Sequence, residues 1–551
     1  MLTLKTYLRQ QIGQTLKTLE LPQVEVKLEP TSSADFGDLS TNLALALARD
    51  AGRPAMELAD EIKDELRISS DYCDTVSVTE PGFINFTISP DYLRNQISGI
   101  LEGAEDWART DVGKGKRSLV EFVSANPTGP LTVGHGRQAV LGDIVSNILE
   151  WHGFDVTREY YYNDAGRQMR LLGESVRARY LDLMGKAVKF PKGGYEGDYI
   201  RDIARSIHEK HGDRLENESE SPIFKETAEE LIFDDIKSTL EKINVRFDEF
   251  VNEKTFYENG SIDRVVETLR KRDIIYDKDG AVWFKTTELG KSQDTVLIKG
   301  TGEPTYRLPD IAYHREKIER DFDLIVDLFG ADHKDAYPDV ISAVRALGYS
   351  TDHIRVLLHQ FVTLKSTGSF GERGEKTRMS TRKATFVTLE DLIDRVGPDV
   401  VRYFFIMRGM QSHLNFDLEL AERESEENPV YYLQYAHARI CNIIKFGEDT
   451  GIKLDSDTDL SLVGEPSERD LLKELIRFPE VTEIALETLE PQGIANYLQA
   501  VAAHFHKFYV ECRVITDDIP LSKARLALVS ATRLVLASGL KILGITRPER
   551  M

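Results

Sequence analysis

Residues 118–162, SLVEFVSANPTGPLTVGHGRQAVLGDIVSNILEWHGFDVTREYYY, decide the fold. Residues 118–123 are a short apolar run typical of a buried strand, and residues 124–132 form a turn-rich loop. From Gly134 to Trp151 apolar residues recur with the 3.6-residue period of an amphipathic helix, and residues 154–162 are the next strand. A strand–helix–strand unit predicts a parallel sheet, whose ligands bind at the carboxyl ends of the strands.

The loop that follows the first strand is not one of the common phosphate-binding loops. The pattern GxGxxG is absent there. Gly290-Lys291-Ser292 nearly completes GxxxxGK[ST], but Lys285 stands where that motif requires its first glycine. A nucleotide would still favour this place, because backbone N–H groups at a helix N-terminus suit phosphate.

The loop and the start of the helix contain SANPTGPLTVGHGR, from Ser124 to Arg137. The end of this string resembles the HxGH signature of class I aminoacyl-tRNA synthetases, and the whole string is similar to that of the arginyl-tRNA synthetases. The resemblance implies that Gly134 makes room for the adenine of ATP and that His135 stabilises charge as pyrophosphate leaves. Thr132 replaces the first histidine; its hydroxyl can donate one hydrogen bond to a phosphate but has no positive charge.

A second string, RMSTRK, resembles the KMSKS loop of the same class, with arginine at both usual lysine positions. Three glycines precede it, as a loop that closes over phosphates would need. The family usually continues with Gly-Asn or Gly-Glu, whereas Ala384-Thr385 follow here. The resemblance assigns catalytic roles to Arg378, Ser380, Arg382 and Lys383 and ATP binding to Met379.

Arginine specificity requires carboxylates, since a guanidinium presents a planar fork of donors that a carboxylate meets in a bidentate manner. Glu121 lies in an otherwise apolar strand, where an unpaired acid would be costly, and this favours a ligand-facing role over an internal salt bridge. By resemblance, Asp310 is the second acid, in a Tyr-x-x-x-Asp motif. The resemblance assigns the arginine site to Glu121, Ser124, Asn126, His135, Tyr306 and Asp310.

Further strings match the family. The segment around Asp332 and His333 is similar to the part that lines the ATP ribose and the substrate amine. Residues 428–439, NPVYYLQYAHAR, resemble the helical anticodon-binding domain, where aromatic rings could stack on unpaired bases and arginine could hydrogen-bond to their edges. The tRNA-binding residues implied are Tyr431, Gln434, Tyr435, His437 and Arg439.

The fold class expected is multidomain α/β, with a Rossmann-like parallel-sheet catalytic domain, an α+β N-terminal domain and an all-α C-terminal domain. We place these at residues 113–425, with an inserted region at about 185–300, at residues 1–112 and at residues 426–551. By resemblance the N-terminal domain touches the tRNA elbow. Within it, the pattern of residues 39–48 predicts a helix and residues 83–86 a strand.

The composition of the chain limits the class of protein and the compartment that we expect. The chain of 551 residues carries a formal net charge of −22, which argues against a wholly basic nucleic-acid-binding protein but not against a local basic face. The three cysteines form no CxxC or Cys/His cluster, so neither a zinc site nor a disulfide framework is expected. No apolar run is long enough for a membrane span, and cytoplasm is the expected compartment.

The resemblance implies ATP-dependent attachment of L-arginine to tRNA(Arg) through an arginyl-adenylate, with ATP and Mg²⁺ as cosubstrate, no tightly bound cofactor or structural metal, and a monomer. Two alternatives stay open. One is a synthetase-like tRNA-binding protein with impaired charging, suggested by Thr132. The other is a different HxGH-type adenylyltransferase, against which the large helical C-terminus and the Glu121/Asp310 pair argue.

Overall fold

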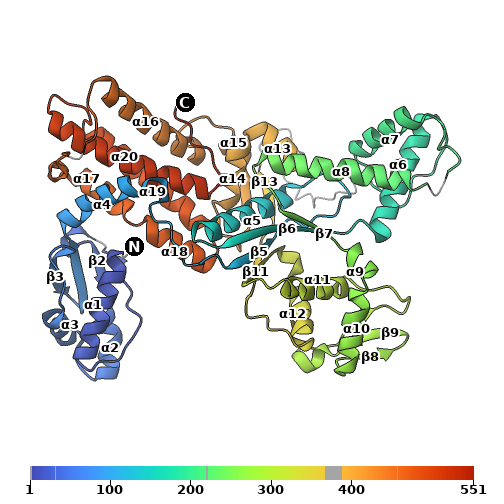
Figure 1. The fold of residues 1–551 in the computed structure, drawn as a ribbon, viewed down its shortest axis with the longest axis horizontal. Helices are drawn as coiled ribbons and strands as arrows, with labels where there is room; N and C mark the ends of the chain where they lie inside the picture. The colour runs from blue at the N-terminus through green and yellow to red at the C-terminus, as the bar shows by residue number, and fades with distance from the viewer. Residues whose placement is uncertain (1–2, 32, 219–220, 366–386, 456) are drawn as a thin grey trace.

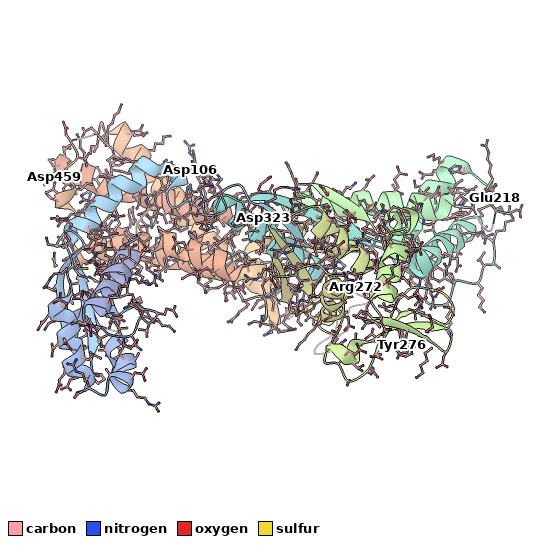
Figure 2. The ribbon with its side chains drawn as sticks, turned by 60° about the horizontal axis from the view of Figure 1, so that its bottom comes forward. Asp106, Glu218, Arg272, Tyr276, Asp323 and Asp459 are labelled. Atoms are coloured by element: carbon pink, nitrogen blue, oxygen red, sulfur yellow. The ribbon has the colours of Figure 1, made fainter. Side chains whose placement is uncertain are left out.

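The computed structural model describes residues 3–31, 33–218, 221–365, 387–455 and 457–551. It is an elongated molecule with a parallel sheet near its middle (Figure 1). The C-terminal helices and the N-terminal region lie at one end of the sheet, and the helices that follow β6 lie at the other. In Figure 2, Asp459 and Glu218 mark these opposite ends. The expected multidomain α/β architecture is confirmed.

The N-terminal region is a small antiparallel sheet covered by helices. Its strands are β1 (Glu29–Pro30), β2 (Leu39–Thr41), β3 (Cys73–Thr79) and β4 (Phe83–Ile88), in the order β1-β2-β4-β3. Its helices are α1 (Leu4–Thr18), α2 (Leu43–Ala51), α3 (Ala55–Glu65) and α4 (Pro90–Gly103). The expected strand at residues 83–86 is confirmed as part of β4. The expected helix at residues 39–48 is wrong at its start, because Leu39–Thr41 pair with β4 and the helix begins at Leu43.

The central sheet has five strands, and every neighbouring pair is parallel. Their order is β12-β11-β5-β6-β7. The strands are β5 (Arg117–Glu121), β6 (Asp155–Tyr162), β7 (Glu249–Asn252), β11 (Leu324–Gly330) and β12 (Ile354–His359). The strand–helix–strand unit expected from residues 118–162 therefore forms β5, α5 (Val133–Trp151) and β6 at the centre of the molecule.

Both faces of this sheet are buried, as parallel sheets require. Val120 and Phe122 belong to the core that contains the apolar face of α5, whereas Leu119 packs with Phe322 and Ile325 on the other face. In α5 two glycines allow close packing: a Cβ at Gly136 would meet the side chain of Leu389 at 2.4 Å, and one at Gly142 would meet Phe122 at 2.1 Å.

The second face of the sheet lies against α11 (Arg307–Glu319), and this face carries charge. In the parallel register Glu121 of β5 is paired with Asp327 of β11 on one side and with Glu159 of β6 on the other. Register partners in a parallel sheet point to the same face, so these three acids form a row across three strands. We call Glu159, Glu121 and Asp327 the acidic row. All three are buried.

The region that we expected to be an insertion, residues 185–300, also contributes β7 to the central sheet. The segments on either side of β7 build two lobes (Figure 1). The helices before β7 are α6 (Gly166–Leu183), α7 (Asp198–His211) and α8 (Ile223–Lys242). After it come α9 (Lys254–Glu258), α10 (Ser261–Lys271), the small antiparallel sheet β8 (Ile275–Lys278), β9 (Ala281–Phe284) and β10 (Thr295–Ile298), and α11. Helix α12 (Tyr337–Ala346) packs on α11 beneath the sheet.

The remaining elements lead from the sheet to the helical end of the chain. They are β13 (Val362–Lys365), α13 (Leu389–Val396), α14 (Pro398–Ile406), β14 (Leu414–Asp417) and α15 (Leu418–Ala421). The C-terminal helices are α16 (Pro429–Asp449), α17 (Pro466–Leu475), α18 (Phe478–Thr488), α19 (Gln492–Glu511) and α20 (Ile519–Ile542). Helix α20 is apolar on most sides and lies among the others, as a central helix of a bundle does. Among the helices of the described ranges, none is long and apolar enough to cross a membrane.

Candidate active site

The N-terminus of α5 lies directly after the loop that leaves β5, and Thr132 is its N-cap. The Thr132 hydroxyl accepts a hydrogen bond from the backbone N–H of His135 at 3.4 Å. In return, Nδ1 of His135 accepts one from the backbone N–H of Thr132 at 3.2 Å. This reciprocal pair is a capping box, a side-chain arrangement that satisfies free N–H groups at a helix start.

The capping box fixes the chemistry of His135. Because Nδ1 is an acceptor, the proton of the neutral ring is on Nε2, which is left to donate a hydrogen bond. Burial lowers the pKa of His135 to about 4, although Asp332 opposes this shift. The ring is therefore a neutral donor near pH 7. Thr132 stands where the signature has its first histidine, and it caps the helix. Its hydroxyl hydrogen remains available to a ligand.

Gly134 is not required by its protein neighbours. A Cβ built there would meet only the Thr132 hydroxyl, at an ordinary 3.6 Å. This contrasts with Gly136 and Gly142 on the same helix, where a side chain would collide with the core. The freedom at residue 134 fits the expectation that a ligand, rather than the fold, needs the space.

The predicted second signature, with Arg378, Met379, Ser380, Arg382 and Lys383, lies outside the described residues. The described residues on both sides of it contact α5 or the residues just before it. Strand β13 ends at Lys365 and contacts α5. On the other side, Thr388 forms a β-bridge with Thr132, and the N–H of Leu389 donates to the carbonyl of Leu131 at 2.8 Å.

The carboxyl ends of β11 and β12 bring further groups to this edge of the sheet. Gly330 ends β11, and Asp332 and His333 follow in a short 3-10 helix, where the His333 ring stacks on Phe329. His359, which the sequence analysis missed, ends β12 and is buried. Its Nδ1–H donates to the carbonyl of Gln360 at 3.3 Å, and burial lowers its pKa to about 4. The sequence feature that could have indicated His359 is a histidine at the end of an apolar strand, at the edge of the sheet where ligands bind.

The loop after β5 holds an unusual backbone conformation. Val123 and Ser124 both have positive φ, +67° and +46°, in a region that non-glycine residues rarely adopt, least of all a β-branched one. Such strain is of the order of 1–3 kcal/mol per residue and persists where surrounding contacts enforce it. Here the Ser124 hydroxyl donates to Oε1 of Glu121 at 2.8 Å and accepts from the N–H of Tyr161 at 3.2 Å.

Asn126 connects this loop to the segment after β6. Its amide nitrogen donates to Gln168 at 3.1 Å, and its amide oxygen accepts from the N–H of Asn163 at 2.9 Å. The second amide hydrogen of Asn126 remains for a ligand. The predicted site residues Ser124 and Asn126 thus lie on one loop, next to Glu121.

Glu121 forms the internal salt bridge that the sequence analysis ranked below a purely ligand-facing role. It is 2% exposed, and its Oε2 accepts from the ammonium of Lys317 at 2.5 Å. Lys317, which is fully buried, also donates to Oδ1 of Asp327 at 2.6 Å. The sequence analysis did not name Lys317 or Asp327 as site residues. Asp327 could have been noticed as an acid in the apolar run of β11, and Lys317 as a lysine seven residues after Asp310.

Asp310 is the acid that stands without a partner. Among the described residues none donates a hydrogen bond or forms an ion pair to its carboxylate. Burial raises its pKa to about 7; His314 and Lys317 act against this shift, while Glu121 and Glu253 add to it. A cation that entered here would restore the charge of Asp310.

The surroundings of Asp310 are aromatic and polar. The ring of Tyr161 stacks on that of Tyr313, with centroids 4.4 Å apart, and its hydroxyl donates to Glu253 at 2.8 Å. Tyr306, one turn before Asp310, is 82% exposed, so it is accessible but does not yet enclose anything. The arrangement offers an unpaired carboxylate for a cationic group at the edge of the sheet that also carries His135.

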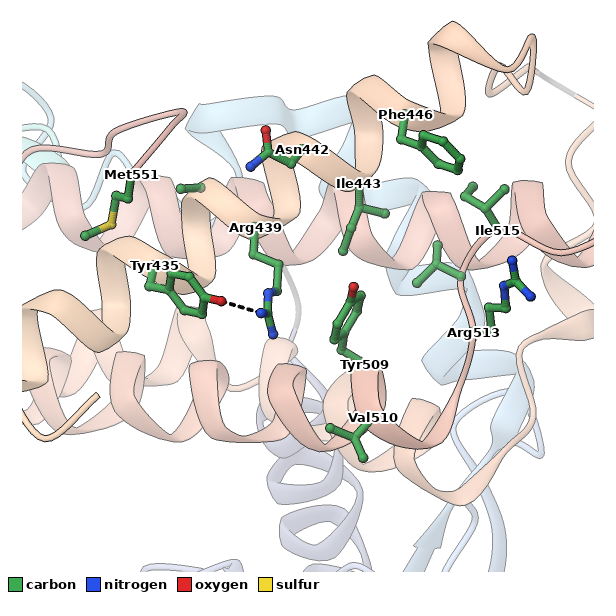
Figure 3. A pocket seen from close by; sticks show the side chains of 12 residues that line it. Tyr435, Arg439, Asn442, Ile443, Phe446, Tyr509, Val510, Arg513, Ile515 and Met551 are labelled. Carbon is green, nitrogen blue, oxygen red and sulfur yellow. Dashed lines mark hydrogen bonds between the residues drawn. The ribbon is translucent and has the colours of Figure 1, made fainter. Parts of the chain in front are cut away.

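A second candidate site is a cavity of about 660 Å³ between α16 and α19 (Figure 3). The guanidinium of Arg439 lies over the rings of Tyr435 and Tyr509, at 4.6 and 4.9 Å from their centroids, and it hydrogen-bonds the Tyr435 hydroxyl. The terminal Met551 also lines the cavity. A partly exposed aromatic and arginine lining suits an unpaired base.

The other predicted tRNA-binding residues differ in their surroundings. Tyr431 stacks on Tyr435. Gln434 donates to Asp399 and to Thr546, and buried His437 hydrogen-bonds the carbonyl of Pro548 at 3.0 Å. The ring of His437 is therefore not free to stack on a base, because it holds the C-terminal tail against α16. This tail ends in Met551 at the cavity.

Comparisons with known families cover nearly the whole chain. Residues 96–399 match the model of the tRNA synthetases class I (R) catalytic domain. Residues 4–88 match the arginyl tRNA synthetase N-terminal domain, and residues 433–551 match the DALR anticodon binding domain. The three matches follow one another in the order of the three regions of the fold.

Curated relatives are similar over nearly their full length. The chain is 48% identical to the arginine–tRNA ligase of Salinibacter ruber, with 100% of both chains covered. It is 49% identical to that of Desulfotalea psychrophila, over 97% of this chain and 94% of the relative. Among solved structures, the arginyl-tRNA synthetase of Thermus thermophilus has the same fold, with a TM-score of 0.77 at 22% identity over 99% of both chains.

Proposed function

This chain belongs to the arginyl-tRNA synthetases, class I enzymes that use ATP to attach arginine to tRNA, and from this premise we propose how its own residues perform the reaction. The observation that carries the proposal is the pairing of two groups at one sheet edge: the neutral donor His135 and the unpaired carboxylate of Asp310. The first serves the phosphates of ATP and the second serves the guanidinium of arginine.

In the first step, the carboxylate of arginine attacks the α-phosphate of ATP. A carboxylate–phosphorus bond forms, the bond to the β-phosphate oxygen breaks, and pyrophosphate leaves from arginyl-adenylate. In the second step, the 2′-hydroxyl of the terminal tRNA ribose attacks the arginyl carbonyl; AMP leaves, and the hydroxyl proton passes to the AMP phosphate or to solvent. Both steps depend on positioning and on stabilisation of phosphate charge rather than on a covalent side chain.

The start of α5 holds the nucleotide. Nε2–H of His135 donates to phosphate oxygens on which charge grows as pyrophosphate leaves, and the Thr132 hydroxyl donates a second hydrogen bond. Gly134 leaves room for adenine, with Asp332, His333 and Met379 nearby. The cations Arg378, Arg382 and Lys383, with Ser380, complete the phosphate site from the second signature. Mg²⁺ enters with ATP, held mainly by the phosphates, as is common for this ion.

Arginine lies between the α5 edge and α11. Asp310 accepts the guanidinium, and Glu121 contributes from the sheet side through the lone pairs that Lys317 and Ser124 leave free. Tyr306, which is exposed, moves over the substrate when it binds. Asn126 and Ser124 take the amino and carboxylate end, which places the carboxylate near His135.

The cavity between α16 and α19 receives an unpaired base of the anticodon loop, which displaces the Arg439 guanidinium from the rings of Tyr435 and Tyr509 and leaves Arg439 at its edge. Tyr431 extends the aromatic surface, while Gln434 and His437 act indirectly by fixing the tail that ends in Met551. The N-terminal region contacts the tRNA elbow. We place the enzyme in the cytoplasm and propose that it acts as a monomer.

The test is charging of tRNA(Arg) with radiolabelled L-arginine in the presence of ATP and Mg²⁺. Arginyl-tRNA should form only when all three substrates are present, and pyrophosphate should be released. A protein that binds tRNA(Arg) without charging it would support the alternative of a synthetase-like binding protein. In that case, threonine at position 132, in place of the first histidine of the signature, would have abolished charging.

A further inference from the structure

The acidic row raises a problem that the fold has to solve. Glu159, Glu121 and Asp327 are register neighbours on adjacent strands and share one buried face. Like charges directly opposite one another destabilise a sheet, and buried charges without partners are more costly still. Glu121 is the last residue of β5, whereas Glu159 and Asp327 lie three residues before the ends of β6 and β11.

Three basic residues on one face of α11 and at its C-cap pair with the acidic row. Lys317 lies between Glu121 and Asp327, at 2.5 and 2.6 Å, and Arg320 donates to Glu159 at 2.5 Å. His314 is the third. Its Nε2 faces the Asp327 carboxylate at 3.1 Å, and its Nδ1 faces the carbonyl of Asp310 at 2.8 Å. Since both ring nitrogens face acceptors, both carry hydrogen and the imidazole is cationic.

The layer is therefore balanced, with three negative and three positive groups. Asp310 lies on the same face of α11, seven residues or about 10 Å before Lys317. The end of α11 is at the opposite edge of the sheet, where the Arg320 carbonyl accepts from Arg117 at the start of β5 at 3.0 Å. Asp310 is thus at the carboxyl edge, and its charge is the one that the layer leaves uncompensated.

We propose that Lys317 is a positioning residue for arginine recognition: its ammonium joins Glu121 to Asp327, fixes α11 on the sheet and leaves the Asp310 carboxylate, which has no ion-pair partner among the described residues, free for a guanidinium. The inference rests on the proposed function, since it requires that arginine binds at Asp310. Lys317 does not contact the substrate. It acts through Glu121, whose orientation it sets, and through the field that it exerts on Asp310.

The same field gives the inference a measurable signature. The groups that face Asp310 are His314 and Lys317 from α11, Glu121 from β5, and Glu253, which follows β7; Tyr161 of β6 and Tyr257 of α9 are also near. Of these, Lys317 favours the ionised carboxylate, while Glu121 and Glu253 oppose it. Removal of Lys317 must then move ionisation of Asp310 to higher pH.

The experiment measures KM for arginine, KM for ATP and kcat between pH 5.5 and 8.5 for the full-length enzyme and its variants. Lys317→Met should raise KM for arginine at pH 7 by about tenfold or more and move the midpoint of its pH dependence upward, where one pH unit corresponds to a tenfold change. KM for ATP should change little.

Two further variants keep the test decisive if Lys317→Met folds poorly. The double variant Lys317→Met with Asp327→Asn removes one charge of each sign and should fold, but it still leaves Glu121 without its ammonium. It should keep the raised KM and the shifted midpoint. Arg402→Met is the matched control, because Arg402 is a buried cation that pairs with Asp143 at 2.5 Å on the α5 side. It should leave the arginine pH profile unchanged.

The inference is overturned if the folded double variant has the arginine KM and pH profile of the wild type, or if its kcat and both KM values deteriorate together as in a general loss of structure. Asp310→Asn, measured in the same series, separates this failure from that of the proposed site. If Asp310→Asn binds arginine normally, the site itself is misplaced; if only the Lys317 variants behave as wild type, Lys317 has no positioning role.

Discussion

Nδ1 of His135 accepts a hydrogen bond of 3.2 Å from the backbone N–H of Thr132. This contact decides which ring nitrogen faces the ligand, because the acceptor Nδ1 leaves the proton on Nε2. It also explains how the chain tolerates threonine in place of the first histidine of its signature. Thr132 caps the helix whose first turn presents His135.

His135 should act as a neutral hydrogen-bond donor. His135→Ala should lower kcat by roughly 10²–10³, as for loss of one donor to a transition-state charge. His135→Gln is the matched control for folding, since glutamine at this position can still accept from the N-cap. It should keep the unfolding temperature while kcat falls. With a pKa of about 4, His135 should produce no change in kcat between pH 6 and 8. A wild-type rate in folded His135→Ala would remove His135 from the mechanism.

Thr132 should show both a capping and a ligand effect. Thr132→Ser keeps the hydroxyl and should preserve activity. Thr132→Val removes the acceptor for the His135 N–H and should destabilise the protein by about 1 kcal/mol, as N-cap losses do. It should also raise KM for ATP if the hydroxyl donates to phosphate. Thermal unfolding and ATP kinetics separate the two effects; equal ATP kinetics in the serine and valine variants would limit Thr132 to capping.

Arginine affinity should depend on pH through Asp310. Its pKa of about 7 in the free enzyme means that the carboxylate is protonated below that pH. A guanidinium requires the ionised form, so KM for arginine should rise as pH falls below about 7, by up to tenfold per pH unit. Arginine binding at pH 6.5 should release protons, which calorimetry in buffers of different ionisation enthalpy detects. A KM that is flat from pH 6 to 8 would contradict this account.

The cavity between α16 and α19 should affect tRNA alone. Arg439→Met and Tyr435→Ala should raise KM for tRNA by roughly 5- to 100-fold, because base stacking contributes about 1–3 kcal/mol per base. KM for arginine and ATP should stay near wild type. Arg469→Met is the control, since Arg469 is exposed on α17 and does not line the cavity. Equal effects of the two arginine substitutions would mean that only overall charge matters.

Much of the architecture could be predicted from sequence periodicity. The β5–α5–β6 unit was found because a buried strand, a 3.6-residue period and a second strand follow one another without interruption. Strand β2 was missed because Leu39–Thr41 run directly into the apolar helix at Leu43. Only pairing with β4, which is far away in sequence, makes these three residues a strand.

Site residues that belong to a sequence motif could be predicted. Residues whose role depends on side-chain contacts between distant parts of the sequence could not. His135 and Asp310 were found by motif. The partner of Glu121 was not, because an ion pair to Lys317 joins residues 196 positions apart in the sequence. His437 has the same explanation, since its partner is the tail at Pro548. A sequence motif shows which side chains are present, whereas tertiary contacts determine which of them remain available to a ligand.

The central claim is that the free carboxylate of Asp310 selects arginine, and the most direct measurement is KM for arginine and for ATP in tRNA charging by Asp310→Asn. Loss of one charge from a desolvated pair costs about 3–5 kcal/mol, so KM for arginine should rise roughly a hundredfold or more while KM for ATP stays near wild type. Glu121→Gln, with its partner Lys317 in place, should have a smaller effect. An unchanged KM for arginine in folded Asp310→Asn would contradict the account.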